Sequence, residues 1–204
     1  MLKIDQSFVR GMLDDSDDLS ILEGILGMAQ AFRRDVIAEG VETVAHGAML
    51  LQLGCDLAQG YGIARPMPAD KLQDWVLNWR VDSSWCNLQV LSRSDLPLLY
   101  AAADHRAWVL LLEKYLRDNS SELPLLNPFE CRFGRWLEGE GRPQHAHKLS
   151  FVLVVHLHQK VHALGSAICF HHDKGQRSQA QALMPEIYKL RDALLVELMT
   201  LVRQ

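Results

Sequence analysis

The first eighty residues alternate short apolar runs with longer stretches of helical periodicity. The apolar runs stand at residues 2–9, 36–41 and 57–64, and the periodic stretches at 18–33, 43–53 and 69–79. Strand-length runs that alternate with helices are typical of parallel sheets, in which each helix connects two strands. Acidic residues from Asp14 to Asp18 favour a helix start there, and Gly54 favours a helix end. The pattern therefore predicts an α/β domain over residues 1–80.

The rest of the chain has helical periodicity without strand-length alternation. Residues 81–97 contain serines, Asp82 and Pro97 but no long periodic run, so we expect a linker there. Apolar positions at helical spacing over residues 98–204 predict an all-α domain, in which helices pack as a bundle. The last helix carries an apolar stripe, which core packing explains, at Leu183, Ile187, Leu190, Leu194, Leu198 and Leu201.

Composition limits the classes of protein that this chain can belong to. With 204 residues and 49% hydrophobic positions, it can form one large or two small cores. No run reaches the length of a membrane span and no signal peptide is visible, so we expect a cytoplasmic protein without membrane contact. A net charge of −4 without a stripe of Lys and Arg argues against nucleic-acid binding. Scattered cysteines favour free thiols over disulfides; they are Cys55, Cys86, Cys131 and Cys169.

Three histidines and one cysteine form the strongest candidate for metal binding. His158 and His162 are four residues apart, so on a helix both imidazoles project from one face. Cys131 lies 27 residues before His158, and His105 lies 26 residues before Cys131. Each interval fits about one antiparallel helix and its turn, so a bundle can collect these ligands. Three His and one Cys suit zinc, and four protein ligands indicate a structural or regulatory site.

The neighbouring residues bear on this prediction. Arg132 and Arg135 lie beside Cys131 and are expected to favour the thiolate, the form that binds zinc. A lone histidine on an apolar helix face is more often a core residue than a ligand, so that alternative stays open for each position taken singly. Trp108 and Trp136 are expected to be core or interface aromatics. The remaining histidines are expected to have no metal role; they are His145, His147, His156, His171 and His172.

Three motifs of this region resemble the chemoreceptor zinc-binding domain family. They are HRAW at 105–108, CRFGRW at 131–136 and HQKVH at 158–162. The resemblance covers about residues 95–204 and implies a four-helix bundle that binds one zinc ion through His105, Cys131, His158 and His162. Three-ligand binding with an exchangeable fourth ligand also stays open. Such domains serve as cytoplasmic zinc or oxidant sensors attached to receptors or to cyclic-di-GMP enzymes.

Polar residues also stand where the predicted strands end. Lys3 lies in the first apolar run, Glu39 and Glu42 end the second, and Gln59 lies in the third. Chemistry in parallel α/β barrels takes place at the carboxyl ends of strands, so these residues are candidates for a metal-assisted hydrolytic site. On spacing alone, Glu39 and Glu42 fit better as acidic residues that begin the next helix, and this alternative is favoured until a family resemblance is considered.

The segments LKIDQSFV, VIAEGVET and GCDLAQGYGIARPMP resemble the last three strand motifs of EAL-type cyclic-di-GMP phosphodiesterases. The resemblance implies that Lys3 contacts the attacking water and that Glu39 is its general base. It also implies that Glu42 supports the site and that Gln59 lines it, with Mg²⁺ or Mn²⁺ as the metal. The family's other metal ligands lie upstream of LKID. Residues 1–80 are therefore expected to be the remnant of a (β/α) barrel that does not hydrolyse cyclic-di-GMP as this chain.

The sequence leaves three interpretations of function. The first is a zinc-binding regulatory module that couples zinc or oxidant level to cyclic-di-GMP signalling. The second is a phosphodiesterase that hydrolyses cyclic-di-GMP to linear pGpG once a missing N-terminal half completes it. The third is a helical dimerisation domain without metal, and a homodimer through the bundle is compatible with all three. Met1 is either an internal methionine or the start of a truncated product.

Overall fold

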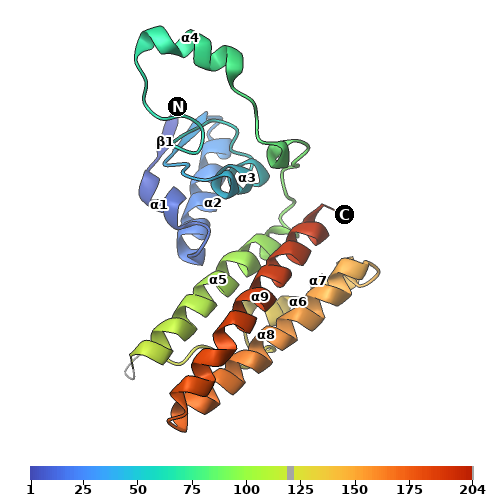
Figure 1. Cartoon of the computed structure of the whole chain (residues 1–204). Coiled ribbons are helices and arrows are strands. Elements are labelled where there is room, and N and C mark those ends of the chain that lie inside the picture. Colours follow the sequence, from blue (N-terminus) through green and yellow to red (C-terminus); the bar gives the residue numbers. More distant parts are fainter. Residues whose placement is uncertain (119–121, 204) are drawn as a thin grey trace. The chain divides into compact units, whose positions relative to one another are not determined.

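The chain divides into two compact units, Met1–Arg93 and Ser94–Gln204. A computed structural model describes residues 1–118 and 122–203, so residues 119–121 and 204 of the predicted helical domain lie outside the described residues (Figure 1). The described part is mostly helical and contains one small parallel sheet. Within it, no helix combines the length and the apolar character needed to cross a membrane.

The first unit is built on three parallel strands in the order β1-β2-β3. They are β1 (Leu2–Ile4), β2 (Val36–Glu39) and β3 (Ala58–Gln59). Leu2 pairs with Val36, and Glu39 pairs with Gln59, so the strands end at one edge of the sheet. The prediction of parallel strands connected by helices is confirmed.

The helices of this unit lie close to their predicted ranges. They are α2 (Ser16–Ala31), α3 (Val44–Gln52) and α4 (Ala69–Asn78). The Asp15 side chain accepts a hydrogen bond from the amide of Asp17 and so caps the start of α2. Gly54 follows α3 with a φ of +84°, a left-handed conformation that glycine adopts without steric cost.

Two strands are shorter than their apolar runs indicated. The prediction of a strand over residues 2–9 was wrong beyond Ile4. The Asp5 carboxylate accepts a hydrogen bond from the Ser7 amide at 2.8 Å and so caps the start of helix α1 (Gln6–Gly11). The run 57–64 forms only the two residues of β3. Beyond it the chain turns back, and the Gly62 amide donates to the Val41 carbonyl at 2.8 Å. Helix α1 still buries the apolar side chain of Val9.

Much of the predicted linker, 81–97, lies within the first unit, which extends to Arg93. A 3₁₀ turn (η1) spans Ser83–Trp85, and the Trp85 indole N–H donates to the Val44 carbonyl at 2.8 Å. Further along, the Leu91 amide donates to the Gln52 carbonyl at 2.8 Å. Both acceptors lie in α3, so this part of the predicted linker is attached to a helix of the first unit. The predicted domain limits themselves stay a prediction.

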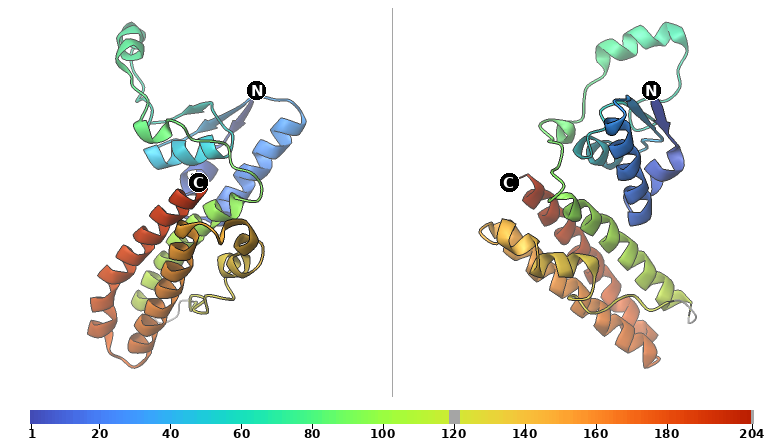
Figure 2. Two further views of the ribbon diagram at one scale, coloured as in Figure 1. Left: turned by 90° about the vertical axis from the view of Figure 1, so that its right-hand side faces the viewer. Right: turned by 180° about the vertical axis from the view of Figure 1, so that it is seen from behind.

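The second unit contains three long helices that pack side by side (Figures 1 and 2). They are α5 (Leu96–Arg117), α8 (Leu149–Asp173) and α9 (Arg177–Val202). Between α5 and α8 the chain forms two short helices, α6 (Arg132–Glu138) and α7 (Gly141–His145). One core joins α5, α6, α8 and α9. A helical packing is therefore present, whereas the four-helix bundle stays a prediction.

The apolar stripe of the last helix lies in this core. Ile187, Leu194 and Leu198 are fully buried, and Leu201 is nearly so. Leu183 and Leu190 are partly buried and pack at the edge of the same core. The exposed face of α9 includes Val196, which is 63% exposed. The core-packing interpretation of the stripe is confirmed.

Leu198→Ala should lower the free energy of unfolding by about 2–5 kcal/mol, because it leaves a cavity in this core. Val196→Ala removes apolar atoms from the same helix at an exposed position and should change stability by no more than about 0.5 kcal/mol. Urea denaturation followed by circular dichroism measures both. Equal losses would contradict the assigned orientation of α9.

Candidate metal centre

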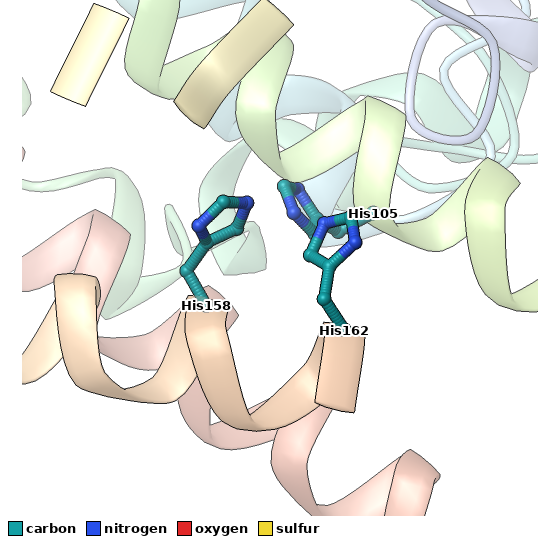
Figure 3. A group of neighbouring side chains, drawn as sticks. All are labelled: His105, His158 and His162. Carbon is teal, nitrogen blue, oxygen red and sulfur yellow. The ribbon is translucent and has the colours of Figure 1, made fainter. Parts of the chain in front are cut away.

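Three histidines from two helices meet inside the second unit. Helix α5 carries His105, and α8 carries His158 and His162 one turn apart (Figure 3). One ring nitrogen from each lies within 4.8 Å of the others. The ring centroids of His158 and His162 are 4.7 Å apart, and each imidazole is at most 3% exposed. The structure thus brings three of the four predicted zinc ligands into one buried cluster.

Cys131 lies next to this cluster, at the N-terminus of α6. Its Sγ is 3.2 Å from Nε2 of His158 but stands outside the group of mutually close ligand atoms. The sulfur also accepts a hydrogen bond from the Gly134 amide at 3.1 Å and therefore caps α6. The thiol therefore lies against the His158 side of the cluster.

Backbone carbonyls fix the orientation of two imidazoles. Nδ1 of His105 lies 2.6 Å from the Ala101 carbonyl, and Nδ1 of His162 lies 3.1 Å from the Leu126 carbonyl. A carbonyl only accepts, so each Nδ1 carries the proton and each Nε2 keeps a free lone pair. Nε2 of His162 is buried and has no hydrogen-bond partner among the described residues. A metal ion would satisfy this nitrogen, so the residues fit zinc.

Burial keeps the histidines neutral. It lowers the pKa of His105 to about 4, and burial together with the charge of His105 lowers the pKa of His162 to about 4. His158 is affected most, because burial and both neighbouring imidazoles lower its pKa to about 2. All three are therefore unprotonated at neutral pH, which is the form that binds metals.

The expectation that Arg132 and Arg135 hold Cys131 as a thiolate is wrong for the metal-free protein. Burial raises the pKa of the Cys131 thiol, and this outweighs the opposing hydrogen bond from the Gly134 amide. Arg132 is turned away to Asp104, which it contacts at 2.9 Å, and Arg135 has the smallest influence on the thiol. A metal ion that bound Cys131 would therefore have to displace a proton.

Three residues around the cluster were not among the predicted site residues: Leu126, Phe133 and Gly134. The segment before α6 supplies the Leu126 carbonyl, and Gly134 has no room for a side chain, because a Cβ there would overlap the Pro128 carbonyl. Phe133 packs its ring edge-on against His105 and His158. In the sequence, only the glycine at 134 signals the close approach of this position to the Pro128 carbonyl. The Leu126 carbonyl gives no sequence signal, because every residue has a backbone carbonyl. Trp136 lies in the core, as expected.

The polar residues of the first unit form two separate groups. Lys3 contacts Glu39 at 2.5 Å, and the Gln59 side-chain amide donates to the same carboxylate at 2.9 Å. Glu42 instead pairs with Arg10 at 2.7 Å. Glu39, Glu42 and Gln59 line one pocket of about 460 Å³. The strand ends thus bring together three of the four predicted residues in direct contact and place the fourth on the same pocket.

Two known families match this chain, one in each of its two units. Residues 1–66 match the EAL domain, and residues 105–169 match the chemoreceptor zinc-binding domain. Each match covers about a third of the chain, and the resemblance stated from the motifs is confirmed. No solved structure matches the chain.

Three of the similar curated proteins each match just over a third of the chain. A bifunctional diguanylate cyclase/cyclic di-GMP phosphodiesterase, MucR of Pseudomonas aeruginosa, is 42% identical over 71 residues, which are 35% of this chain and 10% of MucR. The oxygen sensor protein DosP of Escherichia coli is 40% identical over 75 residues, 37% of this chain and 9% of DosP. The cyclic di-GMP phosphodiesterase RocR of P. aeruginosa is 35% identical over 74 residues, 36% of this chain and 19% of RocR. The chain thus spans less than a fifth of each of these relatives.

The metal-free protein should lose stability as the pH falls from about 6.5 towards 4. In the unfolded chain the histidines bind protons below pH 6.5, whereas folded His105 and His162 do so only near pH 4. The unfolded state therefore binds more protons in this window, and stability falls by up to about 1.4 kcal/mol per pH unit for each histidine. Urea denaturation with a chelator present, repeated at several pH values, measures the slope.

His105→Gln should reduce that slope, because glutamine does not titrate. His156→Gln replaces an exposed histidine on α8 and should leave it unchanged. A wild-type slope that both variants retain in full would show that the buried histidines do not cause the loss.

Proposed function

We propose that the second unit is a zinc-binding regulatory domain that holds one zinc ion through His105, Cys131, His158 and His162. The observation that carries this proposal is the buried cluster of three neutral imidazoles with a thiol 3.2 Å from one of them. We assign the arrangement of α5, α8 and α9 with the short helices as a four-helix bundle of the chemoreceptor zinc-binding type. The match of residues 105–169 supports that assignment.

The donor set suits regulation better than catalysis. Four protein ligands leave no coordination position for a reacting water. When bound, zinc would link α5, α6 and α8 and stabilise the Cys131 thiolate. Because the metal-free thiol is protonated, binding is coupled to proton release, and oxidation of the sulfur removes one ligand. Cys131 is therefore the point at which zinc or oxidant level can act on the domain.

We further infer that this domain belongs to a cyclic-di-GMP signalling protein. The support is the EAL match of residues 1–66 and the likeness to proteins named as cyclic di-GMP phosphodiesterases and as an oxygen sensor. The zinc domain would set the output of the EAL region according to zinc or oxidant level, with two copies associating through the helices. Cyclic-di-GMP is the ligand proposed for the EAL region.

A second candidate is phosphodiesterase activity in a completed barrel. The contact of Lys3 and Gln59 with Glu39 beside a pocket of about 460 Å³ favours it. In such a barrel Glu39 would act as general base with Mg²⁺ or Mn²⁺ held largely by residues of other strands. Among the described residues of the first unit, however, no three potential ligand atoms converge on one metal position.

Purified full chain should contain about one zinc ion per chain by elemental analysis. Cys131→Ala and His158→Ala should each reduce the bound zinc sharply, because each removes a ligand from a four-ligand set. The matched controls are Cys169→Ala, which removes another buried cysteine, and His156→Ala, which removes an exposed histidine from the same helix. Both controls should bind zinc as the wild type does.

Wild-type protein that takes up no zinc after incubation with excess metal would refute the proposal and leave a helical association domain. Equal losses in ligand variants and controls would place the metal elsewhere in the chain.

This chain alone should not hydrolyse cyclic-di-GMP in the presence of Mg²⁺ or Mn²⁺. Glu39 is engaged by Lys3 and Gln59, Glu42 is paired with Arg10, and two carboxylates are too few for a two-metal site. Chromatographic detection of linear pGpG checks this. Turnover that disappears in Glu39→Gln would contradict the expectation and favour the second candidate.

A further inference from the structure

Trp108 connects helix α5 to the irregular segment that precedes α6. Its indole N–H donates to the Leu125 carbonyl at 2.9 Å. The next carbonyl along the chain, that of Leu126, lies 3.1 Å from Nδ1 of His162. The described part of this segment, residues 122–127, has no regular secondary structure, so no helix or strand fixes its carbonyls. A side-chain donor from outside the segment therefore has a direct effect on where the Leu126 carbonyl points.

Gly165 makes room for the indole. It lies three residues after His162 on α8, and a Cβ at this position would overlap the six-membered ring of Trp108. Without that Cβ, the indole packs against α8 with its centroid 5.1 Å from the His162 ring. Trp108 thus contacts His162 twice, through its ring and through the segment that it holds.

The same segment continues to Cys131. The Pro128 carbonyl lies 3.5 Å from Sγ of Cys131. Just before it, the Asn127 side-chain oxygen accepts a hydrogen bond from the Phe129 amide at 3.1 Å and so forms a turn. One short stretch of backbone therefore joins the Leu126 carbonyl, which accepts from His162, to the proposed ligand Cys131. Its Leu125 end is held by Trp108.

We propose that Trp108 is a positioning residue for the metal centre. By holding Leu125 it places the Leu126 carbonyl so that Nδ1–H of His162 donates to it, which directs Nε2 of His162 into the cluster. Hydrogen bonds to the second nitrogen of a metal-binding imidazole set its tautomer and orientation, and their loss lowers metal affinity by about 10–100-fold. This inference rests on the proposed zinc site.

The test compares Trp108→Phe with Trp136→Phe in the full chain. Both variants lose an indole N–H and ring volume from the same unit, but Trp136 Nε1 has no hydrogen-bond partner among the described residues. Competition with a chromophoric chelator measures zinc affinity. Trp108→Phe should lower it by about tenfold, and Trp136→Phe should lower it clearly less. Equal affinities in the two variants would overturn the proposal.

A second readout separates positioning from general destabilisation. Nitrogen-15 NMR of the metal-free chain reports the tautomer of His162 and the solvent exchange of its Nδ1–H. In Trp108→Phe this proton should exchange faster and the tautomer should become mixed, while urea denaturation gives similar stabilities for the two variants. An unchanged His162 signal in Trp108→Phe would also overturn the proposal. Because this readout needs no zinc, it still decides the matter if the wild type binds none and the proposed function fails.

Gly165→Ala provides an independent variant that leaves the indole in place. The added methyl should displace the ring and lower zinc affinity in the wild-type background. In the Trp108→Phe background the same methyl should cost less, because the part of the ring that it meets is gone. Full additivity of the two changes would contradict coupling through Trp108.

Discussion

The burial of three imidazoles at one point is the constraint on which the helical unit depends. A charged imidazole is unfavourable in that environment, so the rings are neutral, and each neutral ring still needs a partner for its N–H. His105 finds one in its own helix, at Ala101, whereas His162 needs the carbonyl of Leu126 from a distant segment. The hydrogen bond from His162 therefore ties the segment that holds Leu126 to α8, in addition to the apolar packing of the helices.

The clustering of His158 and His162 could be predicted from the sequence because it follows from helix geometry. His158 and His162 at a four-residue spacing lie on one face of any helix, and the apolar stripe of α9 is periodic in the same way. The state of the thiol could not be predicted, because it depends on a tertiary contact. Arg132 is next to Cys131 in sequence, yet its guanidinium binds Asp104 on another helix, so proximity along the chain gave the wrong electrostatics.

The first unit shows the same division between local and distant information. Parallel strands followed from the alternation of apolar runs and helices, but the length of β1 depended on the capping by Asp5 of a helix inside an apolar run. Apolar runs of six to eight residues do not by themselves distinguish a strand from a strand followed by a buried helical turn. The contact between Lys3 and Glu39 joins neighbouring strands, so only the sheet order reveals it.

The place of the histidine pair along α8 has a mechanical consequence. The helix has 25 residues and is therefore about 37 Å long, and His158 and His162 stand near its middle. If α8 tilts about the histidine pair, it acts as a lever with two arms of about 18 Å each. A tilt of about 5° about this pair would shift each end of the helix by about 1.6 Å, in opposite directions, by simple geometry from that length. A tilt of α8 about the imidazoles would thus move the two ends of the helix in opposite directions.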